Sequence, residues 1–158
     1  MLQASPHVTP RTSVVVLVLL VGAVAASSAV AARTLVIRLK SVTVSTTVND
    51  VGAEGPSKGD VYSGRFRLLN VVAQFGRPAG RSVGTEESSL RLTSPSMGVV
   101  SGVVTLPGGT ITYRGTGRVG SNAPIPVVRG TGAFAGARGT LIVGSGKSPL
   151  NTYRLTLP

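Results

Sequence analysis

The sequence predicts an all-β domain made of antiparallel strands. From about residue 35 onward, apolar and polar residues alternate with a period of two, which is the pattern of a half-buried strand. Clusters of Gly, Pro, Asn, Asp and Ser separate the alternating stretches, as turns do. No comparable stretch repeats its apolar residues with the period of an amphipathic helix. Short strands joined by turns therefore account for the pattern.

The first predicted strand spans residues 35–48. Its apolar positions have one parity up to Leu39 and the opposite parity from Val42 onward. A slip of one residue near Lys40 is what a β-bulge produces, and bulges help a sheet to curl. The segment 49–59 is rich in turn-forming residues and ends this strand.

The second predicted strand spans residues 60–72 and has one apolar and one charged face. Tyr62 and Phe66 share the apolar face, while Arg65 and Arg67 share the other. Because successive side chains of a strand point to opposite sides, the two aromatic residues are expected inside and the two arginines outside.

The remaining strands follow at short intervals. They are predicted at residues 83–93, 98–106, 110–119, 125–129, 140–144 and 152–157. Pro95 and Pro107 mark two of the turns, and Tyr113 falls on the apolar face of its strand. Eight such strands fit an up-and-down barrel whose closure removes exposed edges, and they fit a two-sheet sandwich equally well.

The N-terminal segment has the features of a secretory signal peptide. Arg11 precedes the apolar run SVVVLVLLVGAVAASSAVAA, and Ala29, Val30 and Ala31 form an A-x-A cleavage site. Residues 1–31 are therefore predicted to be removed, which leaves a domain at residues 32–158 and a secreted protein. The alternative is an uncleaved anchor, since the run is nearly long enough to span a bilayer.

Residue types that are absent exclude several chemistries. The chain contains no cysteine, and its one histidine, His7, lies in the predicted signal segment. Triads that depend on histidine, thiolate nucleophiles, disulfides and the usual zinc or copper sites are therefore excluded from the mature domain. We expect no cofactor and no metal ion.

The chain is strongly basic, with 16 Lys and Arg against 5 Asp and Glu. A positive surface attracts anions in general, which indicates loose binding to anionic cell-envelope polymers or simply a solvated basic surface. The basic residues are scattered singly, and the chain has only 3 Tyr and 3 Phe to stack on bases. We therefore predict no binding of nucleic acid.

A glycine-rich string, VVRGTGAFAGARGT, occupies residues 127–140. It is not a dinucleotide-binding loop, because Gly136 comes one residue too late after Gly130 and Gly132 and no amphipathic helix follows. The glycines are instead expected to supply left-handed backbone angles and close packing at a corner of the fold.

Together with the closing segment NTYRLTLP, this string resembles the signature of the allene oxide cyclase and dirigent protein superfamily. The segments at residues 59–60 (GD), 82–88 (SVGTEES) and 109–119 (GTITYRGTGRV) occur in the order seen in bacterial barrel proteins similar to allene oxide cyclases. The resemblance covers nearly all of the domain. It implies a single antiparallel eight-stranded up-and-down β-barrel of calycin-like shape, a central apolar pocket, and dimers or trimers.

The resemblance also bears on activity. Phe66 and Leu90 fall where the cyclases have a pocket asparagine and cysteine, and Ala133 falls where dirigent proteins often have an acidic residue, whereas Arg138 matches a dirigent arginine. These departures favour binding of a small apolar or aromatic molecule over turnover. An isomerase that cyclises a fatty-acid-derived epoxide remains an alternative, as does a non-catalytic envelope protein. The expected ligand-binding residues are Tyr62, Phe66, Leu90, Tyr113 and Phe134.

The candidates for chemistry are Glu86 and Arg138. Glu86 shares its parity with Leu90, so it is expected to face the barrel interior while Glu87 faces out. A carboxylate in an apolar cavity would have a raised pKa and could act as a general acid or base. The alternatives are a bulge that sends both glutamates to the rim, and an Arg138 that only hydrogen-bonds loop carbonyls.

Overall fold

The computed structural model describes residues 31–144 and 150–158 of the chain. The predicted signal peptide, apart from Ala31, lies outside the described residues. Within the described ranges, no helix is both long enough and apolar enough to cross a membrane.

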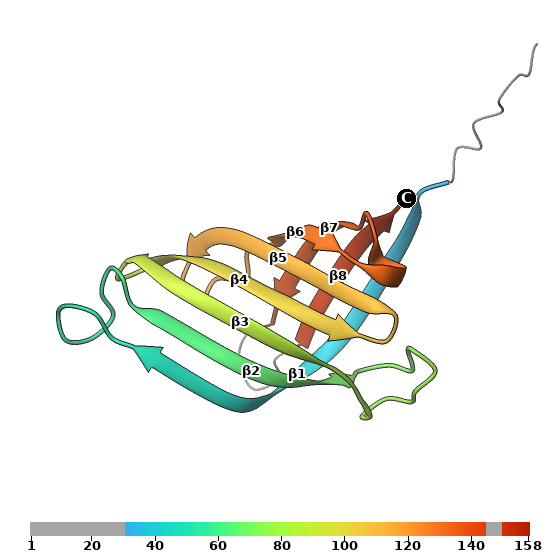
Figure 1. Ribbon diagram of the computed structural model, residues 1–158, viewed down its shortest axis with the longest axis horizontal. Helices are drawn as coiled ribbons and strands as arrows, with labels where there is room; N and C mark the ends of the chain where they lie inside the picture. The colour runs from blue at the N-terminus through green and yellow to red at the C-terminus, as the bar shows by residue number, and fades with distance from the viewer. Residues whose placement is uncertain (1–30, 145–149) are drawn as a thin grey trace, which may run out of the picture.

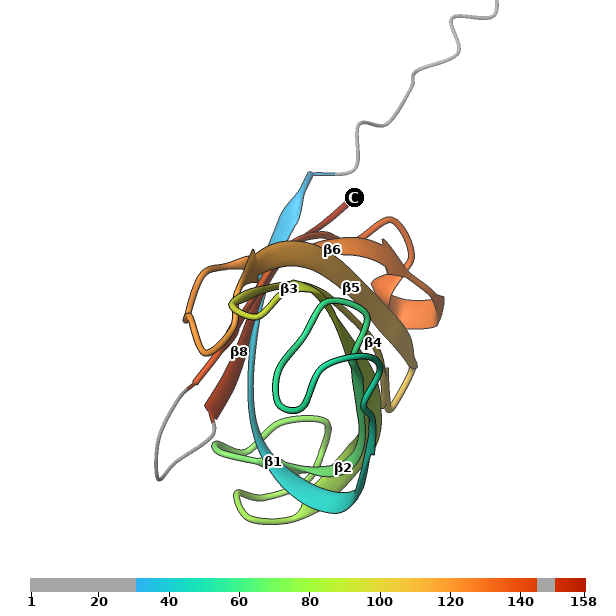
Figure 2. The ribbon, with the colours of Figure 1, turned by 90° about the vertical axis from the view of Figure 1, so that its left-hand side faces the viewer.

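The described chain forms one closed barrel of eight antiparallel strands (Figure 1). Each strand pairs with the next along the chain, and β8 returns to pair with β1, so the end-on view shows a ring (Figure 2). The elements are β1 (Arg33–Asn49), β2 (Val61–Asn70), β3 (Ser82–Ser94), β4 (Met97–Leu106), β5 (Gly109–Arg118), β6 (Ile125–Gly130), a short 3₁₀ helix η1 (Gly132–Phe134), β7 (Arg138–Val143) and β8 (Leu150–Leu157). The predicted up-and-down barrel is confirmed, and the sandwich alternative is wrong.

The predicted position of the bulge in β1 is wrong. The ladder between β1 and β2 slips between Thr43 and Ser45, beyond the predicted slip at Lys40. Ser41 therefore keeps the parity of Ile37 and points inward, where it takes part in hydrogen bonds. The prediction failed because Ser41 is polar although it points inward, and a polar residue at that position suggested that the strand had changed the face it turns to the core.

The core fills one end of the barrel. The core cluster contains side chains from all eight strands and from η1, and they include Val83, Leu106, Ile111, Phe134, Leu155 and Leu157. This is the end at which the β4–β5 turn and η1 meet (Figure 1). The opposite end, beside the β5–β6 loop, has fewer large inward side chains.

The glycine string forms the corner between β6 and β7. Gly132 has a φ of 59°, and a methyl group on it would overlap the carbonyl oxygen of Gly108 in the β4–β5 turn. Only glycine combines this backbone angle with so close an approach. The string therefore has the predicted role of a barrel corner.

Asp60 fixes the long loop between β1 and β2. Its carboxylate accepts hydrogen bonds from the amides of Val51 (2.9 Å) and Ser57 (2.7 Å) and from the Ser57 hydroxyl (3.1 Å). These donors hold the pKa of Asp60 below its ordinary value. The GD segment, which contributed to the family resemblance, thus has a local structural role.

Candidate functional site

A buried carboxylate lies inside the barrel at the centre of a polar cluster. Glu86 on β3 is 5% exposed, and its Oε1 accepts a short hydrogen bond from the hydroxyl of Tyr113 on β5. Its Oε2 accepts from the hydroxyl of Ser41 on β1 (3.4 Å) and from the amide nitrogen of Asn151 on β8 (3.3 Å). The Asn151 nitrogen also donates to Ser41 Oγ at 2.9 Å. Four strands therefore contribute to one hydrogen-bonded network, which we call the Glu86 cluster.

The predicted interior position of Glu86 is confirmed, and the rim alternative is wrong. Glu87 points outward, where it forms an ion pair with Arg65 at 3.2 Å while its side chain stays 69% exposed. The alternation of a regular strand is sufficient to separate these two adjacent carboxylates. A catalytic role for Glu86 stays a prediction.

Tyr113 reaches Glu86 because Gly102 lies between them. Gly102 on β4 pairs with Tyr113 on β5 and with Ser88 on β3. A methyl group at Gly102 would overlap the hydroxyl and the ring of Tyr113. The ring therefore crosses the bare backbone of β4 to meet a side chain from the strand beyond.

Burial disfavours the ionised forms of Glu86, Tyr113 and Tyr153. Desolvation raises the pKa of Glu86, although the hydrogen bonds from Tyr113, Ser41 and Asn151 oppose this effect. Desolvation and the nearby charge of Glu86 raise the pKa of Tyr113 and that of Tyr153 as well. The cluster therefore retains protons to a higher pH than the same groups would in water.

Two buried polar atoms beside Glu86 have no hydrogen-bond partner in the described structure. They are Tyr153 Oη and Asn151 Oδ1. The nearby Asn151 side chain acts to lower the pKa of Tyr153, which burial raises. The two side chains nevertheless form no hydrogen bond of ordinary geometry. Unpaired buried polar atoms are costly, so this pair is suited to bind a water molecule or a hydroxyl or carbonyl group of a ligand.

The hollow end of the barrel contains an open cavity of about 410 Å³. Much of its wall is apolar or without side chains, and this part includes Leu90, Gly98, Val100, Gly115, Gly117, Ile125 and Val143; Thr116, Arg118, Ser121 and Asn122 also line it. Val143 pairs directly with Asn151, so the cavity wall and the Glu86 cluster adjoin between β7 and β8. Gly115 and Gly117 both line this cavity, and Gly117 leaves the more room of the two. No such space opens at Gly64 on β2, because the ring of Phe66 lies against that glycine.

Four of the residues predicted for the site lie on the inner side of the barrel near this region. Leu90 lines the cavity, and Tyr113 belongs to the Glu86 cluster. Tyr62 pairs with Leu90 and Phe66 pairs with Glu86 in the β2–β3 ladder, and both are half-buried.

The other two predicted residues do not join the cluster. Phe134 is buried in the core beside η1, at the filled end of the barrel. Arg138 is exposed at the start of β7 and donates a hydrogen bond to the carbonyl oxygen of Ala137 at 3.0 Å. This is the backbone-satisfying role that the sequence left open for Arg138.

Sequence reasoning missed Ser41, Asn151 and Tyr153. A signal for the last two was present, because they share the parity of Leu155 and Leu157 on the closing strand. No comparable signal identified Ser41, since its polarity indicated a change of face.

The sequence matches no protein-family model and no curated protein. Solved structures with a similar fold include a pyocyanin demethylase, with a TM-score of 0.62 and 22% identity over 78% of this chain and 100% of that one. AbnU, an exo-specific intermolecular Diels–Alderase, has a TM-score of 0.61 and 15% identity over 79% of this chain and 98% of its own. The pterocarpan synthase dirigent protein GePTS1 has a TM-score of 0.55 and 16% identity, over 80% and 86% of the two chains.

These similarities identify the fold class. The chain has the small barrel fold that a dirigent protein and Diels–Alderases share. They support this broad class, and they do not single out the allene oxide cyclases that the sequence motifs suggested.

Proposed function

We propose that this barrel is a secreted protein that binds a small apolar or aromatic molecule in its open cavity, with a polar group of the ligand directed at the Glu86 cluster. The observation that carries the proposal is the cavity itself. Its volume of about 410 Å³ falls in the range of about 300–1,000 Å³ that is usual for small-molecule sites.

The composition of the cavity supports this proposal. Ligand sites combine apolar walls with a few polar groups that fix orientation. Here Leu90, Val100 and Ile125 supply the apolar wall. Thr116, Arg118 and Ser121 supply polar groups in the wall. The unpartnered atoms of Asn151 and Tyr153 lie next to this wall, behind Val143. Structural neighbours of this fold are named for reactions of organic molecules, although a shared fold alone does not assign an activity.

The cavity can be blocked at Gly117. A side chain there has room, because a Cβ atom on Gly117 would meet nothing closer than Ser121 Oγ at 3.9 Å. We expect Gly117→Leu to weaken binding of the neutral fluorescent probe N-phenyl-1-naphthylamine by roughly tenfold or more, measured by fluorescence titration. Thr85→Leu, which adds similar bulk on the outer face of β3, serves as the control and should bind like the wild type. A wild-type protein without saturable binding, or equal binding by all three proteins, contradicts the proposal.

An isomerase or cyclase is the second candidate function. The observation that favours it is Glu86, whose raised pKa and contact with Tyr113 suit proton transfer to or from a bound epoxide. If this function is correct, incubation with a fatty-acid-derived allene oxide should give a cyclopentenone enriched in one enantiomer, as resolved by chiral chromatography. Glu86→Gln should then give racemic product. Racemic product from the wild type rejects cyclase activity and leaves the binding proposal standing.

A further inference from the structure

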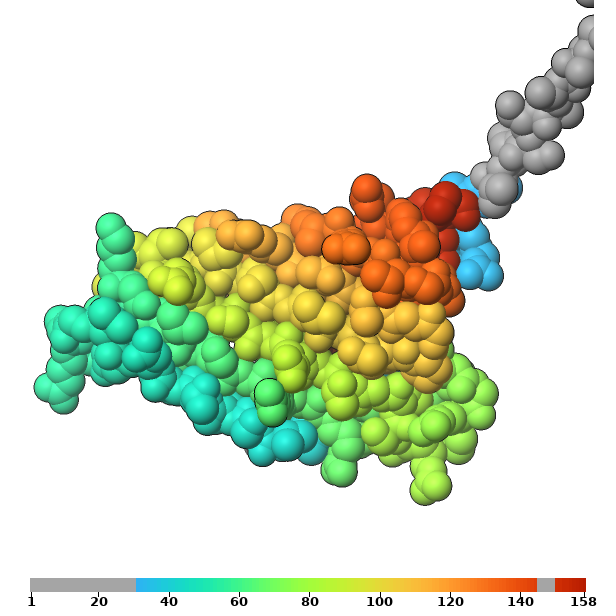
Figure 3. Space-filling view, in the orientation of Figure 1, coloured from blue at the N-terminus to red at the C-terminus, as the bar shows by residue number. Residues whose placement is uncertain are grey.

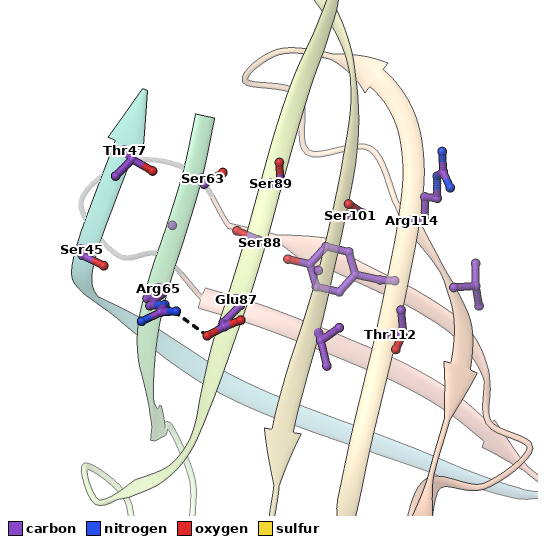
Figure 4. A pocket seen from close by; sticks show the side chains of 15 residues that line it. Ser45, Thr47, Ser63, Arg65, Glu87, Ser88, Ser89, Ser101, Thr112 and Arg114 are labelled. Carbon is purple, nitrogen blue, oxygen red and sulfur yellow. Dashed lines mark ion pairs between the residues drawn. The ribbon is translucent and has the colours of Figure 1, made fainter. Parts of the chain in front are cut away.

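A second hollow lies on the outside of the barrel, on the opposite side of the sheet from the cavity. It is a groove of about 900 Å³ across the outer face of β1 to β6. Figure 3 views the molecule from this side. Along its floor runs a row of outward side chains that pair in the ladder from strand to strand. In order they are Thr47, Ser63, Ser89, Ser101 and Arg114. Figure 4 shows these side chains on their strands.

The groove exists because this row is made of small side chains. Neighbouring strands lie about 4.8 Å apart, so four hydroxyl groups and one guanidinium are spaced at that interval over roughly 19 Å. A second row beside it contains Arg65 and Glu87, which form the ion pair drawn in Figure 4. The groove therefore presents a regular line of hydrogen-bonding groups that ends at the cation of Arg114.

The residues that line the groove carry a net positive charge. Glu87 is the one carboxylate among the described lining residues, and Arg65 already neutralises it. Arg114 has no acidic neighbour among those residues and is exposed. The chain as a whole carries a net charge of +11. An anionic partner is favoured, whereas a second copy of the same chain would bring like charges together.

We propose that this groove binds a linear acidic polysaccharide that lies across the strands. Serine and threonine hydroxyls can donate to and accept from sugar hydroxyls, and an arginine fork matches a carboxylate. The spacing between strands is close to the length of one sugar unit in an extended chain, so successive units would meet successive hydroxyls. Val103 and Val128, 44% and 48% exposed, offer apolar contact to sugar rings.

A single-stranded nucleic acid fits the same charge less well. Binding of that kind relies on aromatic side chains on which bases stack. The one aromatic residue that lines the groove is Tyr113, and its side chain is buried inside the barrel. The groove thus offers hydrogen bonds and charge without a stacking surface.

The test compares polygalacturonate, a linear polymer of uronic acid, with neutral dextran by isothermal titration calorimetry. Arg114→Gln should weaken binding of polygalacturonate by roughly tenfold, because it removes a charge-assisted hydrogen bond. Arg154→Gln removes the same charge from the outer face of β8, and this control should bind like the wild type within about twofold. Dextran should not bind.

A double variant tests the contribution of the hydroxyl groups separately from that of the charge. Ser89→Val with Ser101→Val removes two hydroxyls, keeps the net charge and suits strand positions, so it should fold and should lose roughly tenfold in affinity. If the double variant does not fold, Ser101→Val alone makes the same comparison. Equal losses from Arg114→Gln and Arg154→Gln, full affinity in the valine variant, or tighter binding of single-stranded DNA than of polygalacturonate would overturn the proposal. None of these outcomes affects the interior cavity.

Discussion

Replacement of Gly102 by alanine is expected to lower the free energy of unfolding by about 3 kcal/mol. The new methyl group would occupy the space of the Tyr113 hydroxyl and ring. Tyr113 is among the largest fully enclosed side chains of the barrel, so its rigid ring has no free volume into which to withdraw. If the ring moves, Glu86 Oε1 loses the hydroxyl of Tyr113 as its hydrogen-bond donor while it remains buried, which adds the cost of an unsatisfied oxygen atom.

Urea denaturation followed by circular dichroism measures this loss. Gly117→Ala is the matched control, because it adds the same methyl group on the inner face of β5 where nothing lies closer than 3.9 Å. The control should leave the free energy of unfolding unchanged. Combining Gly102→Ala with Tyr113→Leu should recover part of the loss, and a double-mutant cycle would give the coupling between the two positions. Equal destabilisation by the two alanine variants would contradict the proposed steric role of Gly102.

Replacement of Glu86 by glutamine is expected to stabilise the protein at pH 8, by an amount on the order of 1 kcal/mol. The pKa of Glu86 is raised above its ordinary value of 4.5, so the folded state keeps a proton that the unfolded chain releases. Stability from this group is therefore complete below pH 4.5 and falls as the pH rises toward the folded-state pKa. Glutamine has no proton to lose, and it can still pair with Tyr113, Ser41 and Asn151.

The measurement is a set of urea denaturation curves from pH 4 to pH 8. Wild type and Glu86→Gln should diverge as the pH rises, with the variant more stable at the alkaline end. Glu87→Gln is the matched control, since its side chain is exposed and its ion pair with Arg65 contributes little. Parallel pH profiles for wild type and Glu86→Gln would show that burial does not penalise the charged form.

Strand parity allowed much of the barrel to be predicted. The period of two placed Glu86 inside and Glu87 outside without any knowledge of what Glu86 meets. Closure of the sheet into a barrel could not be predicted from alternation, because a sandwich has the same local pattern. The glycine string favoured the barrel through its resemblance to known barrels. Its close approach to Gly108 now gives that resemblance a physical basis.

The partners of Glu86 could not be predicted in the same way. Asn151 lies 65 residues from Glu86 and 110 residues from Ser41 along the chain. Only the closure of β8 onto β1 brings them together, and alternation along a single strand contains no information about contacts across a barrel. Gly64 shows the same limit, because the rotamer of Phe66 decided whether that space stayed open.

The unequal filling of the two ends means that folding and recognition depend on largely separate sets of residues. Large side chains such as Leu106, Ile111 and Phe134 hold the strands together at one end. The wall at the other end consists in part of Gly98, Gly115 and the β5–β6 loop. Gly98 is closely packed, but a Cβ atom on Gly117 would meet nothing closer than 3.9 Å, so this position can vary in size with little penalty to the core. A barrel divided in this way can acquire a new ligand preference through mutations that leave its stability margin almost intact.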